Sequence, residues 1–471
     1  LFCVFFFLFL LLFIKMLLGR SLGKRHLING IRRYSTAFLN QQTQDSRIDN
    51  GVRVVSESKP GQTAAISVVV NTGSGHETIE NNGVAHFLEH LAFKGTKNRS
   101  KHELELQIEN MGGSLNAFTS REHTVYITKV FKQDVEKAVD ILSDIIQNSN
   151  YEPSDIEYEK HVILREMEEI NKCVDELMMD RLHEISFDGS LAYTILGPES
   201  NIKKFTRDDI VDYVKSYYSS KRIAVAAVGA VDHDELVDLT SKYFTNVSQS
   251  SARDIDMLPN SKFKGGYENI NSNITANSCG IIAYEGASWT SADMIPLLII
   301  QTLVGNFDFQ MGSGVLSNLA QRVAMSVGHK NCEKITSFVT SYCPTGIVGC
   351  TFSAKTNDLE PLVSTIVKGY ADLANSISED DVESAKHRLK SSLSMMYDGI
   401  TPVCEDLGRQ IWTIGRRLPL QEFFDRIDLI NRSHIIEICV RYFQNVAPSL
   451  VTLGKDVKHI EHEKLKEIGK L

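Results

Sequence analysis

Two stretches of the chain, 225 residues apart, share one pattern and decide the expected fold. Residues 207–229 read RDDIVDYVKSYYSSKRIAVAAVG, and residues 432–454 read RSHIIEICVRYFQNVAPSLVTLG. Each stretch begins as an amphipathic helix, passes through a pair of aromatic residues into a β-rich run, and ends on Gly229 or Gly454. The two align without a gap. A self-similar helix–strand segment near the end of each half predicts a duplicated unit.

The length of the chain and the runs between these stretches also indicate two domains. A chain of 471 residues is too long for one compact core. Strand-like runs alternate with helical patterns, at 51–56, 63–71 and 223–230 for strands and at 134–147 and 154–185 for helices. Ser154 and Glu157 after Pro153 read as a capping box that starts the second helix. We expect an α+β fold of two homologous domains, each a mainly antiparallel sheet covered by helices.

Composition sets the expected boundaries. Residues 1–44 contain six Lys and Arg residues and no acid, and the first acidic residue is Asp45. An Arg-rich, Ser-containing, acid-free N-terminus is typical of an organelle transit peptide. A polar stretch at 247–262 reads as a linker. The expected parts are an N-terminal extension with the transit peptide at 1–44, a first domain at 45–248, a linker at 249–262 and a second domain at 263–471.

The N-terminal extension leaves two points open. Residues 1–14 (LFCVFFFLFLLLFI) form an apolar run shorter than the ~18–20 residues of a membrane span. Met16 directly precedes the basic stretch, so we expect it to be the working start; a secretory signal or a short membrane anchor is the competing interpretation. Residues 32–35 (RRYS) resemble a mitochondrial processing site, with cleavage before Ser35.

Charge and cysteine content exclude several classes of function. The net charge of −9 and the pI of about 5.9 argue against binding to nucleic acid. None of the eight Cys residues forms a CxxC pair. A zinc ribbon, a thioredoxin-like site and a disulfide scaffold are therefore not expected, and the pattern fits a reducing compartment.

The residues that carry chemistry lie in the first half, in the stretch 83–96, GVAHFLEHLAFKGT. His86 and His90 are four residues apart, so on a helix they project from one face and can hold a divalent metal, most commonly zinc. Glu89 lies beside them and completes an H-x-x-E-H pattern. The metal would activate water and Glu89 would accept its proton. The alternative is a solvated helix face with two surface His residues.

A third ligand must come from elsewhere in the chain. Glu159 and Glu166 are seven residues apart and fall on one face of the helix expected at 154–185. Either carboxylate could complete a His₂Glu site with an open position. Spacing alone does not choose between them.

Several longer segments resemble one known family. Residues 86–96 (HFLEHLAFKGT) resemble the active-site helix of the β subunits of mitochondrial processing peptidases, which belong to the pitrilysin-like (inverzincin) metallopeptidases. The resemblance spans roughly residues 45–460. Further segments that carry it are 115–122 (LNAFTSRE), 124–126 (TVY), 162–169 (VILREMEE) and, in the second half, 398–417.

The resemblance implies a set of site residues and a substrate. One Zn²⁺ per chain would be bound by His86, His90 and Glu166 in the catalytic first domain, with Glu89 as general base and Glu159 as a supporting acid. The second domain would be homologous and non-catalytic. Substrates would be mitochondrial presequence peptides with Arg at the second position before the cleaved bond.

Substrate contacts are implied in the same way. The family holds the substrate Arg where Glu176 and Asp180 fall, and two carboxylates four residues apart suit a guanidinium group; the alternative is a solvated acidic face. Phe93 would line the pocket for the residue after the cut, or else belong to the core. The expected edge strand at Asn116, Ala117 and Phe118 would bind the peptide by β-addition; a turn at Asn116 is the alternative.

The implied partner is a related α subunit in a heterodimer located in the mitochondrial matrix. Two other functions stay open: a core structural subunit of respiratory complex III, alone or as a dual role, and a stand-alone pitrilysin-like oligopeptidase. Asn318 falls where related second halves often carry an Arg, which leaves a second-half contribution to the site in doubt. The role of Tyr342, near a family Tyr, also stays open.

Overall fold

Two helix-covered β-sheets make up the described part of the chain. The structure is a computed structural model that describes residues 43–249, 261–310, 318–328 and 331–470. Nearly all of the expected extension at 1–44, including Met16 and the expected cleavage before Ser35, and most of the expected linker at 249–262 lie outside the described residues.

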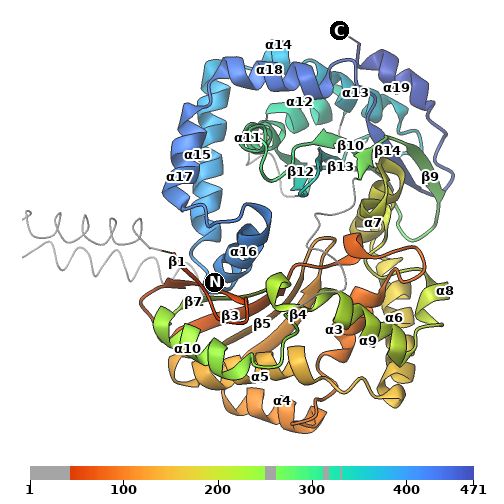
Figure 1. The fold of residues 1–471 in the computed structure, drawn as a ribbon. Helices are drawn as coiled ribbons and strands as arrows, with labels where there is room; N and C mark the ends of the chain where they lie inside the picture. Colours follow the sequence, from red (N-terminus) through yellow and green to blue (C-terminus); the bar gives the residue numbers. More distant parts are fainter. Residues whose placement is uncertain (1–42, 250–260, 311–317, 329–330, 471) are drawn as a thin grey trace, which may run out of the picture. The chain divides into compact units, whose positions relative to one another are not determined.

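The first sheet has the strand order β1-β2-β7-β3-β5-β4 (Figure 1). β2 and β7 are parallel, and the other neighbouring pairs are antiparallel. The predicted strands at 51–56, 63–71 and 223–230 correspond to β2, β3 and β7. The bounds are β1 Gln44–Arg47, β2 Arg53–Ser58, β3 Thr63–Val70, β4 Ser114–Thr119, β5 Thr124–Phe131 and β7 Ile223–Gly229.

The second sheet repeats this arrangement. Its order is β11-β12-β13-β10-β14-β9, with β9 and β14 parallel and the other neighbouring pairs antiparallel. Read from its other end, β9-β14-β10-β13-β12 matches β2-β7-β3-β5-β4 in order and direction, so the predicted duplication is confirmed. The bounds are β9 Tyr267–Asn271, β10 Ser278–Gly286, β11 Asn306–Asp308, β12 Lys334–Ser341, β13 Gly346–Ala354 and β14 Ser449–Gly454.

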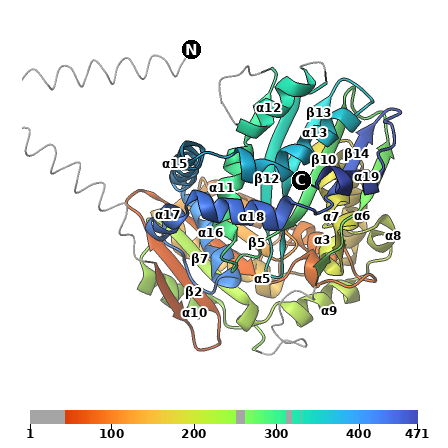
Figure 2. The same ribbon diagram turned by 90° about the horizontal axis from the view of Figure 1, so that it is seen from above.

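Helices cover one face of each sheet. On the first sheet, alternate residues of β3, such as Ile66 and Val68, pack with α3 (Val84–Leu91), α5 (Val135–Asn148), α9 (Arg207–Tyr217) and α10 (His233–Tyr243). On the second, α11 (Met294–Val304), α13 (Glu360–Ala371), α15 (Glu379–Met396) and α18 (Arg432–Phe443) build the equivalent layer (Figure 2). The predicted α+β class with helix-covered, mainly antiparallel sheets is therefore confirmed.

Shorter elements connect these layers. They are α4 Lys101–Asn110, α8 Glu199–Ile202, α12 Asn318–Val327, α14 Leu373–Ser376, α17 Leu420–Leu429, α19 His462–Ile468 and the paired strands β6 Phe187–Asp188 and β8 Lys262–Phe263. Within the described segments, no helix has an apolar run long enough to cross a membrane.

The opposite face of each sheet is covered by a helix from the other half of the chain. α16 (Ile400–Thr413) packs Val403, Leu407 and Ile411 against the first sheet, including Ala65 and Val69 of β3. α7 (Val174–Ser186) packs Met178 and Leu182 against β10 and β14 of the second sheet. Each sheet is therefore buried on both faces only when both halves are present.

A buried polar network fixes α16 on the first sheet. Arg417, four residues past the end of α16, donates 2.7 Å and 2.6 Å hydrogen bonds to Glu57 of β2 and Asp406 of α16. All three side chains are buried. Because breaking a buried pair leaves an uncompensated charge, this network specifies where α16 docks.

The single helix predicted at 154–185 is wrong, because the structure has two helices there. α6 spans Pro153–Ile170, and α7 starts at Val174 after a turn at residues 171–173. The break lets α7 leave the first half and reach the second sheet. The predicted capping box is also wrong: Glu152 is the N-cap and Pro153 is the first helical residue, a position that suits the fixed φ of proline.

Candidate metal and active site

The helix α3 carries the H-x-x-E-H residues, and a carboxylate six residues before its N-cap holds its first turn. Gly83, the N-cap, has φ 101°, a left-handed conformation that favours glycine. Glu77 accepts hydrogen bonds from the backbone N–H groups of Gly83 (2.8 Å) and Ala85 (2.7 Å) and from Asn82 Nδ2 (2.8 Å). Burial raises the pKa of Glu77 to about 8, against the effect of these three donors. The Glu77 carboxylate thus pairs backbone N–H groups that a helix start leaves without a partner.

His86, His90 and Glu166 converge between α3 and α6. The two imidazole rings lie 4.7 Å apart at an angle of 71°. Oε2 of Glu166 is 3.7 Å from Nε2 of His86 and 3.0 Å from Nε2 of His90. One donor atom from each residue lies within 4.8 Å of the others. The structure thus places Glu166, and not Glu159, beside both imidazoles.

Glu159 contacts the opposite side of the His90 ring. Its Oε2 is 3.1 Å from Nδ1 of His90, and its Oε1 is 2.5 Å from Nζ of Lys94. A carboxylate that accepts the Nδ1 proton orients the ring and makes Nε2 the nitrogen that would bind a metal. Nε2 faces the side where Glu166 and His86 lie.

The electrostatics follow from these contacts. Burial lowers the pKa of His90, but hydrogen bonds with Glu159 and Glu166 outweigh burial and raise it to about 9. Hydrogen bonds with His86 and His90 hold the pKa of Glu166 well below its usual range. Burial raises the pKa of Glu159, but hydrogen bonds from His90 and Lys94 lower it overall. Both glutamates are therefore ionised at neutral pH.

These residues fit a zinc ion. Two imidazole nitrogens and one carboxylate oxygen form the His₂Glu donor set of catalytic zinc sites, which leaves a position open for water or substrate. Nδ1 of His86 is buried and accepts or donates no hydrogen bond within the described residues. The ring of His86 is therefore held mainly by packing, whereas the ring of His90 is also held by Glu159.

Glu89 lies between the two His residues in sequence and points to the neighbouring strand. Its Oε2 accepts a 2.6 Å hydrogen bond from Oγ1 of Thr119, the last residue of β4. Glu89 is not in the group of converging donor atoms. It can therefore act on water near the site without being a ligand.

The two acids expected to bind a substrate Arg line one cavity. Glu176 and Asp180 of α7 face a cavity of about 460 Å³ that is also lined by Met167, the neighbour of Glu166. Arg121 lines it as well and forms a 2.8 Å ion pair with Asp180. Asp175 adds a third carboxylate, so the cavity remains acidic overall.

The predicted edge strand is β4, which pairs only with β5 among the described strands. Asn116 and Phe118 are exposed on one face, whereas Ala117 is buried on the other. The outer side of β4 therefore has no strand partner among the described residues, and Asn116 lies in a strand rather than a turn. Phe93 is half-buried against the core of the first half.

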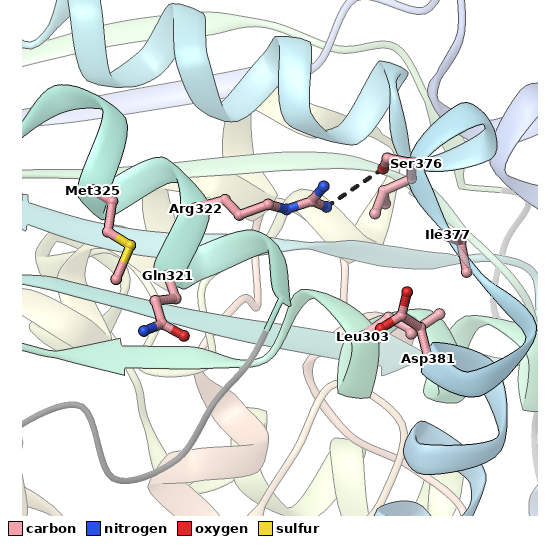
Figure 3. A pocket seen from close by; sticks show the side chains of 8 residues that line it. Leu303, Gln321, Arg322, Met325, Ser376, Ile377 and Asp381 are labelled. Carbon is pink, nitrogen blue, oxygen red and sulfur yellow. Dashed lines mark hydrogen bonds between the residues drawn. The ribbon is translucent and has the colours of Figure 1, made fainter.

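The second half contributes anchoring contacts. Tyr342 is buried, and its hydroxyl lies 2.6 Å from Nε2 of His183 on α7. This contact helps to hold α7 on the second sheet. Asn318 is the first residue of α12. Arg322, one turn later, donates to Ser376 and lines a separate cavity of about 380 Å³ within the second half (Figure 3).

Three contacts were not expected from the sequence: Thr119 with Glu89, Lys94 with Glu159, and Arg121 with Asp180. Lys94 lies three residues beyond the end of α3, and its contact with Glu159 depends on how α3 packs against α6. Thr119 ends β4 and Arg121 lies two residues beyond it, and their contacts depend on how this end of β4 packs against α3 and α7. Sequence spacing does not contain that information.

Known proteins share this chain's sequence and fold. The profile described as "Insulinase (Peptidase family M16)" matches residues 53–199, and "Peptidase M16 inactive domain" matches residues 204–389. The mitochondrial-processing peptidase subunit beta of Bos taurus is 39% identical over 93% of this chain and 91% of its own length. The Saccharomyces cerevisiae subunit beta is 41% identical over 90% and 95%.

A structural comparison agrees on the fold. A chain of "Complex III2 from Candida albicans, Inz-5 bound" has a TM-score of 0.80 over 91% of this chain and 100% of its own length. At 18% identity this likeness concerns the fold alone. The sequence identity to the subunit beta proteins over most of both chains is what shows the family. This chain belongs to peptidase family M16.

Proposed function

We propose that this chain is the catalytic, β-type subunit of a zinc endopeptidase that removes N-terminal presequences from proteins imported into mitochondria. The observation that carries the proposal is the convergence of His86, His90 and Glu166, with Glu89 preceding His90 on the same helix. Relatives about 40% identical over most of their length are named as subunit beta of the mitochondrial-processing peptidase. A complete donor set argues for hydrolysis because a scaffold does not need one.

Each residue has a distinct part in the proposed reaction. His86, His90 and Glu166 would hold zinc, and the chemistry that bound zinc supplies is Lewis-acid activation of water and of a carbonyl group. Glu89 would take a proton from the attacking water and return it to the amine that leaves when the C–N bond breaks. Glu159 keeps His90 in its ligand tautomer.

Two features support a cationic, extended substrate. The open edge of β4 offers main-chain N–H and C=O groups, which read a peptide with little dependence on its side chains. The acidic cavity at Glu176 and Asp180 lies next to Met167 and suits a guanidinium group. We therefore place the Arg that is two residues before the cut in this cavity, with Phe93 on the other side of the bond.

The proposed partner is a related α subunit, and the proposed location is the mitochondrial matrix. The relatives are named as subunit beta of the mitochondrial-processing peptidase, and the basic, acid-free residues 1–44 fit a transit peptide. The α partner and the matrix are what the family resemblance implies. Removal of a transit peptide before Ser35 remains part of this proposal.

The test is a cleavage assay combined with metal analysis, with and without a candidate α partner. We expect one zinc per chain and cleavage of a presequence peptide next to its Arg only when the partner is present. Cleavage of short neutral peptides by the single chain would indicate an oligopeptidase. Comigration with cytochromes in native gels without peptidase activity would indicate a structural subunit of complex III.

A further inference from the structure

The strand β4 ends in a hydroxyl group that contacts the proposed general base. Oγ1 of Thr119 donates a 2.6 Å hydrogen bond to Oε2 of Glu89. Within the described residues, this is the only hydrogen bond that the Glu89 carboxylate accepts. A hydrogen bond to an ionised carboxylate at this distance is short and strong. It fixes one oxygen and leaves Oε1 to exchange protons.

The register of the sheet places Thr119 in this position. Leu115, Ala117 and Thr119 alternate onto the face of β4 that packs toward the helices, where Ala117 is buried. Thr119 pairs with Thr124 of β5. The backbone of Thr119 is therefore held by the ladder, and its side chain needs no rearrangement to reach α3.

The next residue closes the turn that holds this strand end. Ser120 donates from its backbone N–H to the carbonyl of His123 at 2.8 Å, and its Oγ accepts from the N–H of His123 at 2.9 Å. Gly73 passes so close to this turn that a Cβ there would lie 2.1 Å from the carbonyl oxygen of Ser120. The strand end is thus fixed from two sides.

We propose that Thr119 is a positioning residue for Glu89: its hydroxyl holds the carboxylate in the orientation from which it takes a proton from water. The inference rests on the proposed function for the identity of the reaction. A small displacement of a reacting group lowers turnover strongly, whereas substrate contacts elsewhere are unaffected. Loss of the Thr119 hydroxyl should therefore lower kcat without a matching change in KM.

Matched variants separate this role from a structural one. Thr119→Val keeps the shape and β-branching and removes the hydroxyl, whereas Thr119→Ser keeps the hydroxyl. Thr124→Val is the control: Thr124 is the cross-strand partner, and its buried Oγ1 donates to the carbonyl of Thr72 at 3.0 Å. It removes a hydroxyl from the same end of the sheet without touching Glu89.

The experiment uses the zinc-loaded chain with its α partner and a presequence peptide. For T119V we expect kcat to fall about 10- to 100-fold with KM within about twofold of wild type and zinc content unchanged. T119S should retain at least about a third of kcat, since it keeps the donor. Unchanged kcat in T119V, equal losses in T119V and T119S, or the same loss in T124V would overturn the proposal.

A second measurement keeps the two proposals distinguishable. If the wild type with its partner cleaves no presequence, the proposed function fails, and the Thr119 contact is then tested by crystal structures of zinc-loaded wild type and T119V. We expect one Glu89 rotamer in the wild type and more than one in T119V. The same single rotamer in both structures would overturn the positioning role.

Discussion

At the scale of single residues, the site is organised around the two nitrogens of the His90 ring. Glu166 faces Nε2 and Glu159 faces Nδ1, so two carboxylates on one helix contact opposite sides of one imidazole. Spacing alone left these two acids as alternatives for the third ligand, because seven residues put both on the same face of α6; the family resemblance implied Glu166. The position of α3 relative to α6 puts Glu166, and not Glu159, beside both imidazoles.

The role of Glu89 predicts the behaviour of Glu89→Gln. The amide keeps the size of the side chain and can still accept the hydrogen bond from Thr119, but it cannot take a proton at neutral pH. We expect cleavage to fall by at least about 100-fold with normal zinc content. The checks are a presequence cleavage assay and metal analysis of the same sample; retained turnover would contradict the role.

The ligand role predicts a different result for Glu166→Gln. Loss of the carboxylate removes the negative donor that lies near both imidazoles, so we expect zinc content well below one per chain. Glu168→Gln, an exposed neighbour on the same helix, is the matched control and should keep its zinc. A normal metal content in the Glu166 variant would show that the third ligand lies elsewhere.

At the scale of elements, the break between α6 and α7 matters most. α6 holds Glu159 and Glu166, and the turn at residues 171–173 redirects the chain so that α7 presents Glu176 and Asp180 to the cavity beside Met167. Had the helix continued straight, these acids would lie further along the α6 axis. The break therefore decides where the acidic cavity lies relative to the candidate metal site.

The acidic cavity predicts a substrate-dependent effect. In the double variant Glu176→Gln with Asp180→Asn, we expect kcat/KM for a peptide with Arg before the cut to fall about 10- to 100-fold, because charge-assisted hydrogen bonds to the guanidinium are lost. A peptide with Ala in place of that Arg should change by less than about twofold. Equal losses on both peptides would show that the pair is only structural, through Arg121.

Local sequence patterns predicted much of the fold. The features that they missed depend on contacts between elements far apart in the sequence. The repeat at 207–229 and 432–454 became α9 with β7 and α18 with β14, because amphipathic and β-branched periodicities survive in both copies. The turn at residues 171–173 was missed because the hydrophobic pattern on either side of it remains helical. The contact of Thr119 with Glu89 depends on a packing between β4 and α3 that no local pattern encodes.

At the scale of the whole chain, two helices join the halves. α16 of the second half covers the first sheet, and α7 of the first half covers the second sheet; we call this the helix exchange. The apolar faces that these helices cover, including Val69 on the first sheet and Ile281 on the second, are fully buried. Glu122, just beyond β4, adds polar links to the second half by accepting from the indole of Trp289 (3.2 Å) and the backbone N–H of Cys343 (2.6 Å). The halves thus share both apolar and polar contacts.

This exchange predicts how fragments behave. Residues 43–248 and 262–471 expressed separately should each expose one apolar sheet face and therefore aggregate or bind a hydrophobic dye. Their coexpression should restore a soluble complex with one cooperative thermal transition. A cooperative transition in either fragment alone, as a monomer, would contradict this expectation.

The same packing gives a reason why the second half is kept although its helix equivalent to α3 has no metal-ligating residues. α11 takes the place in the second half that α3 takes in the first, yet its sequence MIPLLIIQTLV has no His, Cys, Asp or Glu. After a gene duplication, a copy that has lost its chemistry is usually free to decay or disappear. Here the first sheet lacks one covering layer without α16 of the second half. Under the proposed function, selection on hydrolysis would preserve both copies, and mutations at 400–413 should cost activity although no proposed site residue lies there.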